Sequence, residues 1–198
     1  MLTLYGSVNS SAGRCIWALE EAGISFVLQS VDLKKGEQKA PWFLALNPNG
    51  KIPVLVDGDF SLYESYAINW YVAEKYAPQL LLSTAEDRAL VQQWTHWSGF
   101  HLQCHIETVM YFTFFSRGTL EAMEKAKNDL VPYLHVLDAT HEKNEYILGS
   151  DFSLADINVG SVVNLGASLN LDYTPYVHIS RWLLSLKARD AYARAIAR

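Results

Sequence analysis

The sequence predicts an α/β domain over residues 1–78, followed by an all-α helical bundle domain over residues 84–198. Up to Pro78, short apolar segments with strand character alternate with helical patterns. Beyond Pro78 the strand signals stop and long amphipathic patterns follow. The chain has 198 residues, of which 50% are hydrophobic, so it can form one or two compact cores.

The first half of the α/β domain has the pattern of a strand, a helix and a second strand. Residues 2–5 form a short apolar segment that leads into a small polar loop. Apolar residues then recur at helical spacing from Ala12, and Gly23 can close this helix. Residues 26–31 predict the second strand. These elements together indicate a βαβ unit.

The second half of this domain predicts a short helix, a hairpin and a longer helix. Residues 41–46 start with proline and are followed by Asn-Pro-Asn-Gly at 47–50, which stops the helix. An Asp-Gly-Asp turn separates residues 54–56 from residues 60–63 and indicates a β-hairpin. Residues 67–76 continue as a helix. The order βαβ-α-ββα is that of a thioredoxin-like layer, a four-stranded sheet with helices on both faces.

The second domain opens with two long predicted helices. The first starts at residues 83–86, where Ser-Thr-Ala-Glu matches a capping box. Apolar and aromatic residues then recur over a run in which Gly99 can mark a bend. Gly118 breaks the run. Residues 120–142 predict the second long helix, and Pro132 can kink it.

Three further helices complete the predicted bundle. Ser153 and Asp156 indicate the start of one of them, because Asp three positions after an N-cap serine can bond back to the N-cap amide. Residues 179–186 and 190–197 predict two closing helices.

Charge and cysteine content exclude several classes of function. A formal net charge of −5 argues against a broad nucleic-acid surface. No apolar stretch approaches the roughly 20 residues that span a bilayer, and the N-terminus shows no leader pattern, so we expect a cytoplasmic protein. Cys15 and Cys104 have no metal-type spacing, and His101 and His105 lack the HExxH pattern. No metal site is expected.

The most informative segment is residues 36–76. Pro53 stands between apolar residues where a strand begins, and a cis peptide bond there would turn the backbone of Ile52 outward. Glu64 and Ser65 precede a helix, whose free N–H groups attract a carboxylate. Ser65 can bond that carboxylate, Glu64 can accept from an ammonium group, and Ile52 can pair with a peptide unit. Helix capping is the alternative role for Glu64 and Ser65. Glutathione has this shape.

With these residues, the segment resembles the thioredoxin-like half of glutathione S-transferases, most closely the serine-type phi and theta classes and their bacterial relatives. The similarity extends over essentially the whole chain. It implies a homodimeric detoxification enzyme that uses glutathione as co-substrate, with no metal, and conjugates it to a small apolar electrophile. Two alternatives stay open: a glutathione-dependent peroxidase or disulfide reductase on the same site, and a non-catalytic binding module with this fold.

The resemblance places the thiol-activating residue in the loop after the first strand. A free thiol with a pKa near 8.5 is only a few per cent thiolate at neutral pH, and a hydroxyl donor beside a helix N-terminus can stabilise the anion. Ser10 is the leading candidate, since it lies between Tyr5 and Arg14 at the spacing of serine-type transferases. Ser11 is the second candidate. The alternative is that one of the two serines only caps the helix that begins near Ala12, and we expect Ser11 to be that cap.

Three further side chains are candidates for contacts with the glycine end of glutathione. Gln38 stands where phi enzymes usually carry histidine, and it can donate a hydrogen bond without a charge. Lys39 and Lys51 can supply the positive charge, and Lys51 replaces a glutamine that is common before the apolar residue and proline. Solvated surface positions are the alternative for both lysines.

Aromatic side chains are the candidates for the apolar co-substrate pocket. Tyr5 ends the first strand, and we expect it in the core or in the pocket wall. Tyr111, Phe112 and Phe115 can line an apolar site that faces the thiol. Core packing is the alternative for each of these three residues.

Overall fold

The computed structural model describes residues 1–198 and contains two compact units. The first unit comprises Met1–Leu81 together with Arg189–Arg198, and the second comprises Leu82–Ala188. The break between them lies where the strand signals of the sequence end. The end of the chain differs from the division expected from the sequence, because the segment from Arg189 onward packs within the first unit.

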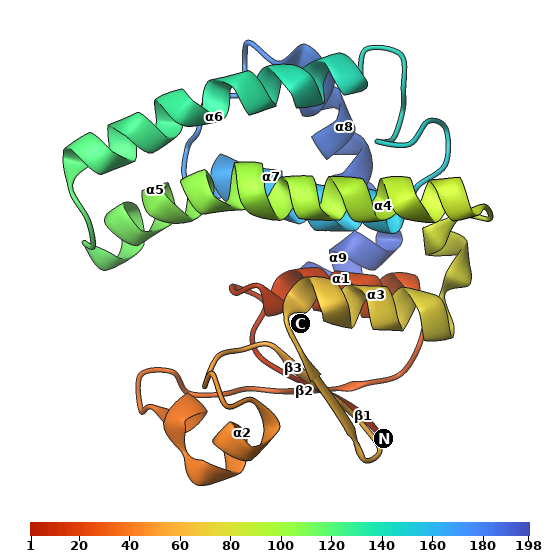
Figure 1. Cartoon of the computed structure of the whole chain (residues 1–198), viewed down its shortest axis with the longest axis vertical. Helices are drawn as coiled ribbons and strands as arrows, with labels where there is room; N and C mark the ends of the chain where they lie inside the picture. Colours follow the sequence, from red (N-terminus) through yellow and green to blue (C-terminus); the bar gives the residue numbers. More distant parts are fainter. The chain divides into compact units, whose positions relative to one another are not determined.

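A four-stranded mixed sheet forms the centre of the first unit (Figure 1). The strand order is β2-β1-β3-β4. The strands are β1 (Leu2–Tyr5), β2 (Val27–Gln29), β3 (Val54–Asp57) and β4 (Phe60–Tyr63). Strand β1 is parallel to β2, and β3 is antiparallel to both β1 and β4. The four predicted strands are confirmed. Strand β2 is shorter than predicted, since Phe26 and Val31 are buried beside the edge ladder without joining it.

Helices cover both faces of this sheet (Figure 1). They are α1 (Ala12–Glu21), α2 (Pro41–Leu46), α3 (Ser65–Tyr76) and α9 (Asp190–Ile196), with short 3-10 turns at Glu37–Lys39 and Pro78–Leu81. Helices α1 and α3 pack together on one face, α2 lies on the other, and α9 packs on α1. The predicted thioredoxin-like order βαβ-α-ββα is confirmed.

The core under α2 uses the sheet face that carries Tyr5. Phe43 of α2 is fully buried and packs with Val31 and Val54. The Tyr5 ring meets the Phe43 ring edge-on, with the ring centroids 6.3 Å apart. Because side chains alternate along a strand, Leu4 points to the opposite face, where it is fully buried.

The second unit is helical, as predicted. Its elements are α4 (Ala85–Trp97), a π-helical segment (Ser98–Gln103), α5 (Cys104–Phe115), α6 (Leu120–Thr140), α7 (Leu154–Ser168) and α8 (Val177–Lys187). The irregularity predicted at Gly99 is this π-helical segment, whose wider turns let the chain continue directly from α4 into α5. Pro132 lies inside α6.

The capping box at the start of α4 lies one residue later than predicted. Thr84, not Ser83, is the N-cap: its Oγ1 accepts a hydrogen bond from the Asp87 N–H at 3.0 Å. The Asp87 carboxylate in turn accepts from the Thr84 N–H at 3.0 Å. Thr and Asp supply the same chemistry as Ser and Glu, so the letters alone allow both registers. At α7, the predicted pair of Ser153 and Asp156 is confirmed.

The Asp156 carboxylate is fully buried and holds three segments of the second unit together. Its Oδ2 accepts from the Ser153 N–H at 3.0 Å. Its Oδ1 accepts from the Ile147 N–H at 2.9 Å and from Trp182 Nε1–H at 3.0 Å. Burial raises the pKa of Asp156 to about 6. The His141 ring stacks on Trp182 with the centroids 4.5 Å apart, and burial lowers the pKa of this imidazole to about 4.

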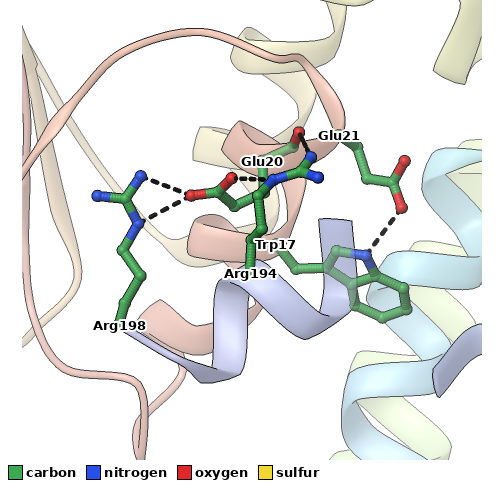
Figure 2. Close-up of polar contacts among 5 residues, drawn as sticks. All are labelled: Trp17, Glu20, Glu21, Arg194 and Arg198. Atoms are coloured by element: carbon green, nitrogen blue, oxygen red, sulfur yellow. Dashed lines mark hydrogen bonds and ion pairs between the residues drawn. The ribbon is translucent and has the colours of Figure 1, made fainter. Parts of the chain in front are cut away.

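Helix α9 is tied to α1 by a group of ion pairs that we call the C-terminal clamp, formed by Glu20 and Glu21 with Arg189, Arg194 and Arg198. Glu20 accepts hydrogen bonds from Arg194 Nε at 2.9 Å and from Arg198 Nη2 at 2.6 Å (Figure 2). Arg189 Nε donates to Glu21 Oε1 at 2.6 Å. Part of the clamp lines a hollow of about 390 Å³ that contains none of the predicted site residues.

Candidate active site

Helices α1 and α3 begin at the same edge of the sheet. Strands β1 and β4 point in the same direction, because each is antiparallel to β3. Helix α1 follows β1 and α3 follows β4, so both helix N-termini open at the carboxyl ends of these strands. Unpaired N–H groups and partial positive charge favour anionic ligand groups there. Ser10 and Ser11 lie at one N-terminus, and Glu64 and Ser65 at the other.

Ser10, rather than Ser11, satisfies the first turn of α1. Its Oγ accepts a hydrogen bond from the Ala12 N–H at 3.1 Å and donates one to the Ser7 carbonyl at 2.8 Å. Ser11 has helical backbone angles, and its side chain makes no capping hydrogen bond. The expectation that Ser11 caps this helix is therefore wrong. A residue already in the helical conformation cannot turn its side chain back to the first N–H groups.

The loop before β3 is held by one buried asparagine that the sequence analysis missed. Asn47 Nδ2 donates to the Lys51 carbonyl at 2.7 Å, and Asn47 Oδ1 accepts from the Asn49 N–H at 3.0 Å. The Ile52–Pro53 peptide bond is cis, as expected. The signal for Asn47 was the Asn-Pro-Asn-Gly string, in which asparagine commonly bonds the backbone two residues ahead.

The candidate contacts for the glycine end lie around the same loop. Lys39 Nζ donates to the Asn49 carbonyl at 3.0 Å, and Gln38 Nε2 lies 3.4 Å from the Leu33 carbonyl. Gly50 has φ +58°, and a Cβ there would come within 2.7 Å of the Gln38 backbone carbonyl oxygen, so only glycine fits. The Lys51 side chain is exposed. Lys39 is thus partly committed to shaping the loop, whereas Lys51 points into solvent.

Glu64 and Ser65 stand at the start of α3 in an unusual conformation. Glu64 has φ +72° and ψ +112°, a region that non-glycine residues rarely occupy and that is often retained at functional sites. Its side chain makes no capping hydrogen bond and is exposed, which removes capping as its alternative role. Ser65, the first residue of α3, is only 8% exposed. The Glu64 side chain therefore accepts no hydrogen bond from the first N–H groups of α3.

The four aromatic candidates for the co-substrate pocket differ in their surroundings. Tyr5 belongs to the core under α2, where its ring also contacts Trp42 with the centroids 5.9 Å apart. In the second unit, Tyr111 and Phe115 of α5 are 42% and 57% exposed, and their ring centroids lie 6.0 Å apart. Phe112 is half-buried. Core packing therefore accounts for Tyr5 but not for Tyr111 and Phe115.

The remaining titratable residues do not gather into a metal site. The structure contains no group of three or more His, Cys, Asp or Glu side chains placed to hold an ion. His101 and His105 instead both stack on the Tyr133 ring, with centroid distances of 4.9 Å and 5.9 Å. No helix combines the length and apolar character needed to cross a membrane.

Comparisons with known proteins agree with this arrangement. The family models for the N-terminal and C-terminal domains of glutathione S-transferase match residues 1–74 and 102–190. Glutathione S-transferase F10 of Arabidopsis thaliana is 35% identical over 224 residues, covering 100% of this chain and 97% of the relative. The disulfide-bond oxidoreductase YfcG of Escherichia coli is 31% identical, and the match covers 99% of this chain and 94% of that relative.

Among solved structures, the theta-class glutathione S-transferase of Xanthomonas axonopodis pv. citri with glutathione bound superposes with a TM-score of 0.92. It is 29% identical, and the match covers 100% of this chain and 97% of that one. Family models, full-length relatives and fold all agree, and the chain belongs to the glutathione S-transferase family.

Proposed function

We propose that this protein conjugates glutathione to an apolar electrophile, with the ligand bound across the N-termini of α1 and α3. The supporting observation is that the helix that follows Ser10 and the helix that begins at Ser65 open at one edge of a single sheet. A peptide with a thiol in its middle and charged groups at its ends can use both N-termini at once. Its thiol then faces Ser10 while its γ-glutamyl end faces Ser65.

The charged ends of glutathione each have a complementary partner in this proposal. The γ-glutamyl carboxylate lies at the α3 N-terminus with the Ser65 hydroxyl, and Glu64 accepts from the ammonium group. The backbone of Ile52, beside the cis bond to Pro53, pairs with the cysteinyl peptide unit. Three side chains face the glycine carboxylate: Gln38, Lys39 and Lys51. Of these, exposed Lys51 offers the charge with the fewest other commitments.

Ser10 activates the thiol in this proposal by stabilising its anion. The Ser10 hydroxyl rotates away from the Ser7 carbonyl and donates to the sulfur, while the α1 N-terminus adds positive potential. A thiol pKa lowered by two units corresponds to about 2.7 kcal/mol of stabilisation. The proton leaves to solvent, the thiolate forms a carbon–sulfur bond with the electrophile, and the displaced group departs. Positioning supplies most of the remaining rate.

The apolar part of the co-substrate binds, in this proposal, to the aromatic side chains of α5. Tyr111 and Phe115 expose large apolar faces that are unusual on a free surface, and Phe112 adds a half-buried ring. Apolar walls discriminate by shape, so we expect a range of aryl halides to be accepted.

Titration of the bound thiol by ultraviolet absorbance tests the assignment of Ser10. We expect Ser10→Ala to raise the thiol pKa by one to two units, about 1.4–2.7 kcal/mol, and to lower kcat with an aryl halide about 10- to 100-fold. Ser11→Ala is the matched control and should change both quantities less. Equal or reversed losses in the two variants would refute the role of Ser10.

Reduction of disulfides or peroxides on the same site is the second candidate. The Escherichia coli relative is named as a disulfide-bond oxidoreductase, but the relatives of higher identity are named as glutathione S-transferases, so we rank conjugation first. The thiolate would attack a disulfide sulfur and expel a thiolate, or attack a peroxide oxygen and expel an alkoxide. A second glutathione would then attack the resulting mixed disulfide or sulfenic acid and form oxidised glutathione, with release of a thiol or of water. Parallel assays with aryl halides, peroxides and mixed disulfides rank the two activities. Failure of the wild type to be retained on immobilised glutathione would instead favour a non-catalytic module.

We also propose a cytoplasmic homodimer with a role in detoxification, as the family resemblance implies. The exposed rings of Phe60 and Phe100, 46% and 74% exposed, are apolar side chains that a subunit contact could bury. Light scattering on the purified protein measures the oligomeric state. A monomer at micromolar concentration would contradict the dimer.

A further inference from the structure

Three contacts join the first two turns of α1 to the first two turns of α3. The Cys15 thiol lies 3.5 Å from the Ser65 carbonyl oxygen. Asn69 Nδ2 donates to the Arg14 carbonyl at 3.3 Å. The Arg14 guanidinium lies over the Tyr66 ring, 4.5 Å from its centroid. We call these contacts the α1–α3 joint.

Cys15 occupies the centre of this joint. Its thiol is fully buried, and burial raises its pKa to about 12, so it stays neutral and keeps its proton at physiological pH. The single S–H can be donated to the Ser65 carbonyl at 3.5 Å or to the Ser11 carbonyl at 3.9 Å. The sulfur therefore touches the backbone of both helix starts that the proposed function uses.

The three contacts constrain how the two helix starts can move. Protein interiors are close-packed, so a displacement of one buried group is passed on to its neighbours. Arg14 and Cys15 are consecutive, as are Ser65 and Tyr66, so the contacts oppose both sliding and rotation of one helix start against the other.

We propose that Cys15 is a positioning residue that sets the spacing between the thiol-activating hydroxyl of Ser10 and the carboxylate-binding start of α3 at Ser65. This inference rests on the proposed function. It predicts that removing the S–H contact with the Ser65 carbonyl misplaces the two ends of glutathione relative to each other, although Cys15 does not touch the ligand.

Kinetics of Cys15→Ala and Cys15→Ser test the inference. We expect Cys15→Ala to raise KM for glutathione and the bound-thiol pKa together, with KM on the order of tenfold higher and KM for the aryl halide unchanged. Cys15→Ser keeps a donor to the Ser65 carbonyl and should restore most of both quantities. Cys104→Ala, which removes the exposed thiol of α5, is the matched control and should change neither.

A lower melting temperature for Cys15→Ala with unchanged KM for glutathione and unchanged thiol pKa would overturn the inference, since Cys15 would then only pack. If Cys15→Ala does not fold, Cys15→Val fills the volume without a donor and must show the same paired changes. Ser10→Ala measured in parallel separates the two proposals. A raised thiol pKa in Ser10→Ala alone overturns the role of Cys15, whereas a wild type that does not bind glutathione overturns both.

Discussion

Ser10 and Ser65 have different surroundings, which suit the different roles proposed for them. Ser10 is half-buried and already bonded to its own loop, so its hydroxyl must exchange the Ser7 carbonyl for the ligand sulfur. Ser65 is nearly buried at the start of α3. A hydroxyl held there loses little conformational entropy when it binds a carboxylate. We therefore expect Ser65 to matter for affinity and Ser10 for the reactivity of the thiol.

Ser65→Ala should weaken glutathione binding without changing the pKa of the bound thiol. A hydrogen bond to a charged group contributes about 1.5–3 kcal/mol, so the dissociation constant should rise about 10- to 100-fold. Isothermal titration calorimetry measures this change. Ser61→Ala, which alters an exposed serine of β4, is the control, and an unchanged constant for Ser65→Ala would count against the carboxylate contact.

At the scale of elements, the C-terminal clamp decides where α9 belongs. Glu20 is 8% exposed and receives Arg194 and Arg198 together. Burial alone would raise the pKa of this carboxyl, but hydrogen bonds from Arg194 and Arg198 outweigh it and hold the pKa below its usual value. A lowered pKa in the folded state stabilises the fold above the ordinary value near 4.5, and this contribution is lost as the pH falls below it.

Glu20→Gln should loosen α9 from α1 at neutral pH. Partly buried ion pairs fall between exposed and buried ones, so we expect a loss on the order of 1–3 kcal/mol in the free energy that holds α9 in place. Trypsin cleavage after Arg194 should become about 5- to 100-fold faster, measured by mass spectrometry. Glu145→Gln, at an exposed position, is the control, and equal cleavage rates in both variants would refute the clamp.

Helix caps show what sequence patterns determine and what they leave open. Ser153 and Asp156 were predicted correctly because only one register of that segment places both residues at a helix start. Thr84 and Ser83, like Ser10 and Ser11, are neighbours with the same hydroxyl chemistry, and only the backbone angles distinguish the cap. Composition and periodicity do not specify those angles at single-residue precision.

At the scale of the whole molecule, the second unit contains two buried titrating groups with opposite effects on stability. His141 has a folded-state pKa of about 4, below its ordinary 6.5, so its neutral form stabilises the fold and this contribution is lost as the pH falls from 6.5 to 4. Asp156 has a raised pKa of about 6 against 3.8, so its contribution grows over much of the same range as the pH falls. The two trends partly cancel.

His141→Phe should isolate the contribution of His141 to the pH dependence of stability. The phenyl ring can still stack on Trp182 but cannot bind a proton. We expect the melting temperature of His141→Phe, minus that of wild type, to increase as the pH falls from 6.5 to 4 and to stay constant above pH 7. Circular dichroism measures both melting temperatures. His135→Phe, at an exposed histidine of α6, is the control. A difference that does not vary with pH would contradict the lowered pKa of His141.

The sequence predicts local elements better than contacts between distant parts of the chain. Strands and helices were found because periodicity and turn residues are local signals: the Asp-Gly-Asp turn marks the hairpin, and Pro41 begins α2 as expected. The return of α9 to the first unit was not found. It depends on Glu20 meeting Arg194 across 174 positions of sequence, and no local pattern encodes such a pairing.

Because Arg189–Arg198 belong to the first unit and α9 packs on α1, the helical unit is an insertion within the first unit rather than a downstream appendage. Recombination between relatives should therefore use two splice points, one before Leu82 and one after Ala188. In a chimera joined only at the first splice point, Glu20 and Glu21 would face the C-terminal segment of the other protein. The first unit would then lose the ion pairs that its own last helix supplies.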